Sequence, residues 1–284
     1  MNVNRVKKQA AQYLSFDMIQ QHTELPSFPD FQVQLLLAFL QPDLQRGRRD
    51  ELYSLVLSLV QIGLDAHDEV SVRNDETEIA EMRSKQIKIL AGDYLSGRYY
   101  ELLAAAGEID AVRRIAEAIS DVNQMKISLY LRKQQRDLSG EQYLQQLLAI
   151  RTRLFLAFEG DVPEGQRKIW RDLLAAGTKA LILKQEWQHL TELSGDYEGW
   201  AVWELLSLAT EEDRSKVLAV LDEPEALRAW FETHRIVERL EAECERTEEE
   251  LQQLTMNMRS EPLYEEAILP VIDDLRRITS RLYN

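Results

Sequence analysis

The sequence is poor in the residues that end helices and strands. Only 11 glycines and 7 prolines occur among its 284 residues, about half of the ~12 % share that these two residues have on average. So few turn residues leave few turns and long elements. This excludes a sandwich or barrel of many short strands, a collagen-like chain and a proline-rich disordered chain. Hydrophobic residues make up 45 % of the sequence, which is enough for a substantial core.

Basic residues are also scarce. The chain has 34 Lys and Arg against 49 Asp and Glu, for a net charge of −15. A nucleic-acid-binding domain needs a basic face, and an anionic membrane surface attracts clusters of Lys and Arg. The densest basic cluster here is only Arg46, Arg48 and Arg49. The composition therefore argues against nucleic acids and anionic membranes as partners.

Cysteines and long apolar runs are nearly absent. Cys244 is the single cysteine, so no intrachain disulfide can form, which fits a reducing cytosol. The longest apolar run, Leu35 to Leu40, is far shorter than the ~20 residues of a membrane-spanning helix. No N-terminal stretch has the parts of a signal peptide. We expect a cytoplasmic protein without an integral membrane segment.

Apolar residues recur at helical spacing along the whole chain. One such series, at spacings of three and four, is Val112, Ile115, Ile119, Val122, Met125 and Leu129. This period is that of one face of a helix. No segment long enough for a strand alternates strictly between apolar and polar residues. The pattern predicts an all-α fold. The predicted helices lie near 3–21, 30–40, 48–71, 76–106, 109–136, 140–158, 164–192, 199–209, 211–221, 224–258 and 261–282.

We predict one all-helical domain over residues 1–284, with a seam near 160–165 between an N-terminal and a C-terminal half. Pro270 is expected to kink or split the last helix. The charged stretch at residues 239–254, RLEAECERTEEELQQL, is interpreted as the solvent-facing side of a helix, with a partner-binding helix as the alternative.

Common catalytic signatures are missing. The four histidines, His22, His67, His189 and His234, show no metal-ligand spacing. There is no phosphate-binding Walker loop and no GxGxxG motif. Sequence motifs of ordinary metal, nucleotide or dinucleotide sites therefore give no indication of function.

Two linked segments are more informative. Residues 67–72 read HDEVSV, and residues 87–104 read IKILAGDYLSGRYYELLA. In this order they resemble the trans-prenyl diphosphate synthases, in which a helix with aspartates at i, i+1 and i+4 precedes a helix containing LAGDYL. Carboxylates at i and i+4 share a helix face and can bind Mg²⁺, which holds an allylic diphosphate. The resemblance implies an isoprenoid-synthase-like helical bundle.

The acidic motif is degenerate in this chain. Asp68 and Glu69 match its first two positions, but the third is Val72, whose apolar side chain cannot bind a cation. The second acidic motif of the family has no counterpart in the C-terminal half. We therefore expect no catalytic residue and no metal in this chain, with Mg²⁺ bound by a catalytic partner. The alternative is a shifted cation site at Asp65, Asp68 and Glu69, which also share a face. Such a site would make the chain a self-sufficient synthase.

The sequence is most similar to the small, non-catalytic subunits of bacterial heterodimeric heptaprenyl diphosphate synthases. The matching residues are Lys85-Gln86, the stretch 90–104 and parts of 119–130. The resemblance implies a partner subunit that binds a catalytic polyprenyl synthase subunit. It would assist chain elongation and control of product length, for the side chain of menaquinone. The alternative is a helical adaptor without a prenyl role.

Two groups of residues are candidates for that role. Gly63 lies a little over one turn before Asp68 and is predicted to leave space beside a growing isoprenoid tail. Its apolar neighbours would form the wall of that space: Leu55, Leu59 and Ile62. The predicted interface with the catalytic subunit consists of Tyr99, Tyr100 and Leu103, since aromatic residues are enriched at interface hot spots. For both groups the alternative is an ordinary place in the core of the bundle.

Overall fold

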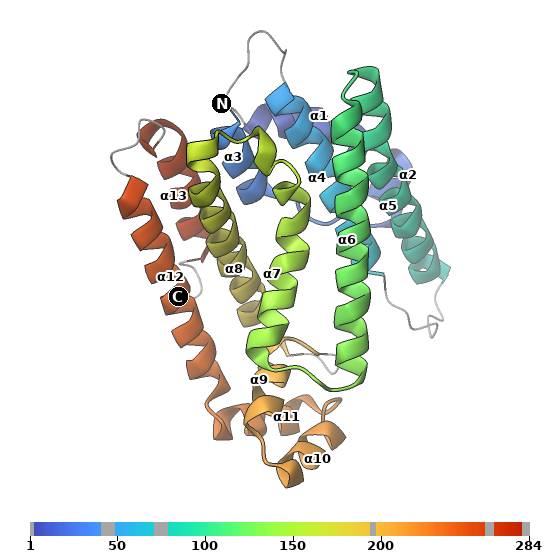
Figure 1. Cartoon of the computed structure of the whole chain (residues 1–284). Coiled ribbons are helices and arrows are strands. Elements are labelled where there is room, and N and C mark those ends of the chain that lie inside the picture. Colours follow the sequence, from blue (N-terminus) through green and yellow to red (C-terminus); the bar gives the residue numbers. More distant parts are fainter. Residues whose placement is uncertain (1–2, 41–48, 71–78, 194–196, 259–263, 280–284) are drawn as a thin grey trace. The chain divides into compact units, whose positions relative to one another are not determined.

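The computed structural model describes residues 3–40, 49–70, 79–193, 197–258 and 264–279. These residues form helices and their connections and include no strand (Figure 1). Val72 and the basic residues Arg46 and Arg48 lie outside the described residues. The all-α prediction is confirmed.

The chain divides into two compact units. The first comprises Met1–Ile119 and Leu154–Arg167, and the second comprises Ser120–Arg153 and Lys168–Asn284. The division passes through two long helices, α6 (Ile109–Gln134) and α7 (Gly140–Leu156). The segment 160–165, where we predicted a seam, lies inside the first unit.

The first unit is built around a helix that is apolar on all sides. Between Tyr53 and Leu64 this helix, α4, contains no charged residue, and a helix without a polar face is stable only when it is buried. Its side chains from Tyr53 to Val60 are accordingly all buried. Helices α1, α3 and α5 pack against it, and α2 packs against α5. The α-helices of this unit are α1 (Val3–Leu14), α2 (Asp17–His22), α3 (Asp30–Phe39), α4 (Arg49–Asp68), α5 (Ile79–Ala105) and the start of α6.

The second unit has its core around two tryptophans. Trp170 and Trp203 are both fully buried. The helices of this unit, besides most of α6 and α7, are α8 (Arg167–Glu192), α9 (Trp200–Leu208), α10 (Glu211–Ala219), α11 (Pro224–Thr233), α12 (Ile236–Met258) and α13 (Leu269–Thr279).

Side-chain caps fix the start of two helices. At α7, the Ser139 hydroxyl accepts a hydrogen bond from the Gln142 N–H (3.2 Å), and the Gln142 side chain accepts one from the Ser139 N–H (3.1 Å). This reciprocal pair is a capping box. At α10, the Thr210 hydroxyl accepts from the Asp213 N–H. Both helices begin at the residues predicted from the sequence, 140 and 211.

Three of the predicted helices are interrupted. The stretch 3–21 is broken between Leu14 and Asp17, and the stretch 224–258 is broken next to Arg235, which has a left-handed φ of 52°. A helix cannot continue through a left-handed residue. The last stretch contains a π-helical turn, Tyr264–Ile268, before α13. Pro270 lies in the first turn of α13, directly after this π-helical turn. The helix type therefore changes next to the proline that was expected to kink or split this stretch.

The charged helix α12 is amphipathic. Its buried residues fall on one side and are Ile236, Leu240, Thr247, Leu251, Thr255 and Met258. Most of its remaining side chains are exposed, and its charged groups are mainly acidic, with seven Glu against Arg239 and Arg246. This exposure agrees with the interpretation of the stretch as the solvent-facing side of a helix, and the alternative, a partner-binding helix, stays a prediction. Within the described ranges, no helix combines the length and the apolar character that crossing a bilayer requires.

Candidate functional site

The pair of helices α4 and α5 brings the two sequence motifs together. The residues His67, Asp68 and Glu69 lie at the C-terminal end of α4 and just beyond it, and the LAGDYL segment lies in the middle of α5. The two helices pack side by side within the first unit (Figure 1). The motif positions are therefore neighbours in space, as the resemblance implied.

Glycines allow the close approach of these helices. A Cβ atom added at Gly63 would lie 2.9 Å from the Gly92 carbonyl oxygen and 2.9 Å from the Ser96 nitrogen. A Cβ atom at Gly92 would lie 2.7 Å from Nε2 of His67 and 3.0 Å from the Gly63 oxygen. Only glycine fits such a backbone-to-backbone contact. The prediction that Gly63 leaves open space for an isoprenoid tail is wrong, because the α5 backbone fills that space.

The acidic groups near this contact are already engaged by side chains of the same chain. The Lys88 ammonium donates to the Glu69 carboxylate (2.7 Å), and the Gln61 amide donates to the Asp65 carboxylate (2.8 Å). Nε2 of His67 lies 3.3 Å from Oδ1 of Asp93. The Lys88–Glu69 and His67–Asp93 pairs connect the end of α4 to α5, whereas the Gln61–Asp65 hydrogen bond lies within α4.

The residues present do not fit a Mg²⁺ ion. Such a site needs several oxygen ligands converging on one point, and within the described ranges no group of three or more His, Cys, Asp or Glu side chains is placed to hold a metal. The described Asp65, Asp68 and Glu69 are not arranged as such a group, which argues against the alternative of a shifted cation site. The third position of the degenerate motif, Val72, lies outside the described residues.

The predicted wall residues belong to the core of the first unit. Leu59 and Ile62 are fully buried, and Leu55 is nearly so. Their burial agrees with an ordinary structural role in α4. That they also contact a hydrocarbon tail stays a prediction.

The predicted interface residues on α5 differ in their surroundings. Tyr100 is 62 % exposed, Tyr99 is half-buried and Leu103 is fully buried. The prediction that Leu103 contacts a partner is wrong, because its side chain packs inside its own chain. Leu90, which we did not single out from the sequence, is 62 % exposed. Its distance of ten residues from Tyr100, almost three helical turns, could have revealed that the two share a face.

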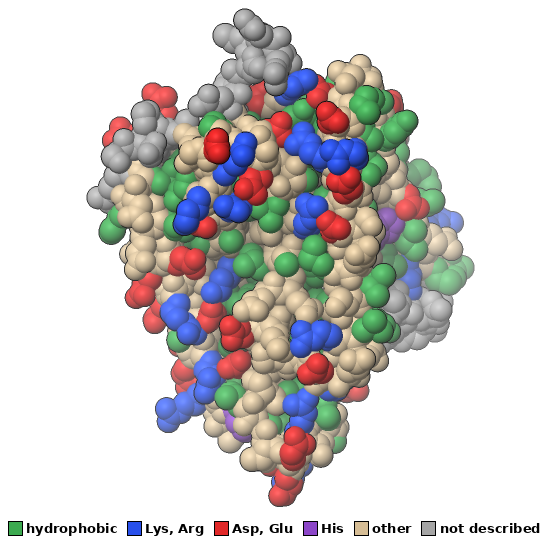
Figure 2. Space-filling model, viewed as in Figure 1, with side chains coloured by type: hydrophobic (Ala, Val, Ile, Leu, Met, Phe, Trp, Pro, Cys, Tyr) green, Lys and Arg blue, Asp and Glu red, His purple; other side chains and the backbone are tan. Residues whose placement is uncertain are grey.

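A second exposed apolar group lies on the part of α6 that belongs to the second unit. Ile127, Tyr130 and Leu131 are each more than half exposed, and hydrophobic side chains are visible along the edge of the molecule where α6 runs (Figure 2). Three large apolar side chains within five residues are unusual on a free surface and indicate a contact surface.

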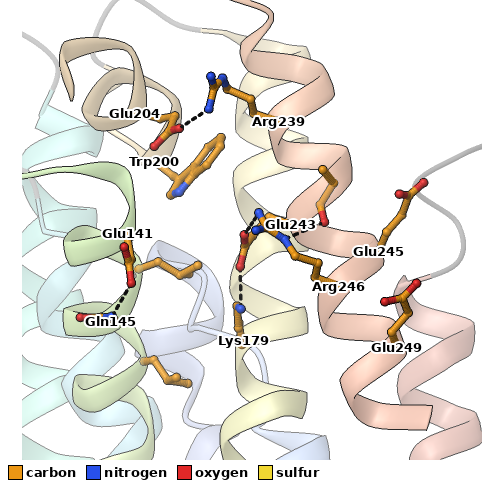
Figure 3. A pocket seen from close by; sticks show the side chains of 13 residues that line it. Glu141, Gln145, Lys179, Trp200, Glu204, Arg239, Glu243, Glu245, Arg246 and Glu249 are labelled. Carbon is orange, nitrogen blue, oxygen red and sulfur yellow. Dashed lines mark hydrogen bonds and ion pairs between the residues drawn. The ribbon is translucent and has the colours of Figure 1, made fainter. Parts of the chain in front are cut away.

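The second unit contains a charged groove of about 820 Å³ between α7, α8, α9 and α12 (Figure 3). Lys179 lies 2.6 Å from Glu243, and Arg239 lies 3.2 Å from Glu204. The third basic side chain of the groove, Arg246, also pairs with Glu243. Lys179 and Arg246 share one carboxylate, but the lining has five glutamates against three cations. The groove therefore has an excess of negative charge, which disfavours a diphosphate. Sequence reasoning missed it because its residues come from four separate helices.

Another polar cluster lies inside the second unit around the buried Glu186. Its carboxylate accepts hydrogen bonds from the Tyr197 hydroxyl (2.9 Å) and the Trp200 N–H (2.8 Å). Burial, together with the charge of Glu186, raises the pKa of Tyr197 and of Tyr143. Burial also lowers the pKa of the neighbouring Lys133. The cluster joins the start of α9 to α8 and is structural in its geometry.

Comparison with known proteins identifies relatives of the chain. The family model for heptaprenyl diphosphate synthase (HEPPP synthase) subunit 1 matches residues 16–188. Heptaprenyl diphosphate synthase component 1 of Geobacillus stearothermophilus is 44 % identical over 82 residues, which are 29 % of this chain and 35 % of that protein. The match thus spans about a third of this curated relative.

Solved structures show the same fold over nearly the whole chain. Heptaprenyl diphosphate synthase from Staphylococcus aureus superposes with a TM-score of 0.69 at 12 % identity, covering 99 % of both chains. Decaprenyl diphosphate synthase from Rhodobacter capsulatus gives a TM-score of 0.67 at 17 % identity, covering 97 % of this chain and 99 % of the other. The predicted isoprenoid-synthase-like bundle is confirmed.

Proposed function

Because the chain belongs to the heptaprenyl diphosphate synthase subunit 1 family, we propose that it is the non-catalytic subunit of a heterodimeric heptaprenyl diphosphate synthase. The relative from Geobacillus stearothermophilus is called component 1, which implies a second component. That component would carry the Mg²⁺ ions and the reacting diphosphates. Together the two chains would add isopentenyl units to an allylic diphosphate, in the cytoplasm, for the side chain of menaquinone.

The state of the acidic motif supports the proposal that the other component, and not this chain, binds the Mg²⁺ ions. A synthase needs carboxylates that are free to bind Mg²⁺. Here the Glu69 carboxylate is paired with Lys88, and that of Asp65 is hydrogen-bonded to Gln61. Glu69, at the second position of the degenerate motif, thus connects the end of α4 to α5 instead of facing a free site.

The observation that carries the proposal is the uncovered apolar side of α5. Leu90 and Tyr100 are both 62 % exposed, although Leu103 on the same helix is fully buried. An aromatic and a leucine side chain exposed on one helix provide the apolar centre that a protein interface requires. A helix of the catalytic subunit would cover them.

Binding between this chain and the catalytic subunit can be tested with the two purified proteins. We expect the chain to form a stable complex with the catalytic synthase subunit of the same genome. Leu90→Glu places a charge in the apolar interface, so it should weaken the complex roughly tenfold or more. Met256, on α12, is 58 % exposed, and Met256→Glu is the matched control, which should bind normally. Equal binding by both variants and the native chain would refute the α5 interface.

The role in product length is part of the same proposal. The complex should make longer products than the catalytic subunit makes alone, and the product distribution can be read by mass spectrometry. A complex that forms but changes neither the rate nor the length would instead favour the alternative, a helical adaptor without a prenyl role. No finding at present favours that alternative.

A further inference from the structure

Gly97 occupies an unusual place in the middle of α5. Glycine inside a helix is less favourable than alanine, because it loses more backbone freedom on folding. At Gly63 and Gly92 the close contact of α4 and α5 explains the glycine. At Gly97, in contrast, an added Cβ atom would meet no atom within 4 Å among the described residues. Nothing in the described part of the chain therefore requires a glycine at position 97.

The surroundings of Gly97 form a stripe with the spacing of a helix-to-helix contact. Leu90, Gly97 and Ala104 follow each other at intervals of seven residues, and Asp93 and Tyr100 lie three residues after the first two. This alternation of three and four is that of the contact positions in paired helices. All five residues are exposed. The stripe thus has large side chains at Leu90 and Tyr100 and a gap between them at Gly97.

A gap between two large exposed side chains is suited to a closely approaching helix. Packed helices lie about 8–10 Å apart, at a distance set by the side chains at their crossing point. Glycine at the crossing point permits the shortest distance, as it does within this chain at Gly63. The side chains on either side then pack against the flanks of the incoming helix.

Charge favours a different chain over a second copy. A second copy that crosses antiparallel at Gly97 would bring Asp93 opposite Glu101 of the other molecule, because each lies four residues from the glycine. A parallel crossing would bring the two Asp93 side chains together. Like charges in an interface oppose association. Within the chain, Asp93 lies 3.3 Å from Nε2 of His67 and Glu101 pairs with Arg98, but the two acidic side chains remain 68 % and 61 % exposed. A partner helix with a basic residue at this level is therefore complementary to Asp93.

We propose that Gly97 is the point of closest approach between α5 and an apolar helix of the partner component, with Leu90 and Tyr100 packing on either side of the crossing. This inference rests on the proposed function, since it takes the catalytic synthase subunit as the partner. It assigns to the glycine a role in assembly, and it requires a small residue there only in the complex.

Two substitutions at position 97 test the inference. Gly97→Ala should raise the melting temperature of the free chain by about 2 °C, because the helix gains stability and the side chain meets no clash. Gly97→Leu should leave the free chain folded but weaken its affinity for the catalytic subunit roughly tenfold or more, because the crossing point is filled. Ala149 on α7 is also exposed, and Ala149→Leu is the matched control, expected to bind like the native chain.

The outcomes distinguish this inference from the proposed function. Native affinity in Gly97→Leu, together with lost affinity in Leu90→Glu, would refute the crossing at Gly97 but keep the α5 interface. A lower melting temperature of free Gly97→Ala would show that position 97 is packed within its own chain, which also refutes the inference. If Gly97→Leu abolished self-association of the free chain instead, the occupant would be a second copy. A native chain that does not bind the catalytic subunit would refute both proposals.

Discussion

The contact between Gly63 and α5 leads to a quantitative prediction for Gly63→Ala. The added methyl group would lie 2.9 Å from two backbone atoms, the Gly92 oxygen and the Ser96 nitrogen. Because both belong to the backbone of a packed helix, neither can rotate away. Relief requires α4 and α5 to move apart by a few tenths of an ångström along a contact that spans the core of the first unit.

The expected magnitude follows from two opposing effects. Overpacking costs about 1–3 kcal/mol, and the upper part of this range, about 2–3 kcal/mol, applies here because both close atoms belong to the backbone. Replacing a helix-interior glycine by alanine returns about 1 kcal/mol. The net loss of unfolding free energy is about 1–2 kcal/mol. The corresponding fall in melting temperature is roughly 2–8 °C. Thermal and urea unfolding followed by far-UV circular dichroism measure both quantities.

Gly92→Ala provides the internal comparison. The nearest atom to its added methyl group is Nε2 of His67, at 2.7 Å, and this ring can rotate at the expense of its contact with Asp93. We therefore expect a smaller loss than at Gly63, although the Gly63 oxygen at 3.0 Å prevents a neutral result. A Gly63→Ala variant as stable as the native chain, or more stable, would show that the two helices are not in close contact at this point.

Further predictions concern three other residues. Tyr100→Ala should weaken binding to the catalytic subunit with little effect on the melting temperature, since the side chain is exposed. Leu103→Ala should do the opposite and reduce the unfolding free energy by about 2–5 kcal/mol, and similar stability losses in the two variants would contradict the assignment. The raised pKa of Tyr197 means that the tyrosine ionises first in the unfolded state, so stability should fall as the pH rises above about 10. Tyr197→Phe should reduce that fall, and an unchanged slope in pH-dependent urea unfolding would refute the assignment.

Periodicity and turn residues were sufficient to predict most of the helices. The apolar spacing gives the long helices α4 to α8 and α12. The predicted starts at residues 140 and 211 coincide with the side-chain caps of Ser139 and Thr210. The break at Arg235 could not be predicted, because arginine has no preference for the left-handed conformation that it adopts there. Tertiary packing, which the local sequence does not contain, selects that conformation.

At the candidate site, too, the sequence predicted the motifs but not how their side chains pack. The sequence identified the two motifs and their order, but it could not show which side of each helix faces inwards in the folded chain. Gly63 was therefore interpreted as open space, although it is a contact, and Leu103 as an interface residue, although it is core. Burial of one residue depends on all the helices around it, and the charged groove of the second unit depends on four of them.

The central claim is that this chain acts only together with a catalytic subunit. The most direct measurement is the formation of polyprenyl diphosphate from farnesyl and isopentenyl diphosphates with Mg²⁺, using each purified chain alone and the two chains mixed. We predict heptaprenyl diphosphate from the mixture and no turnover by this chain alone. Turnover by this chain alone, or a mixture whose rate and product length equal those of the catalytic subunit alone, would contradict the account.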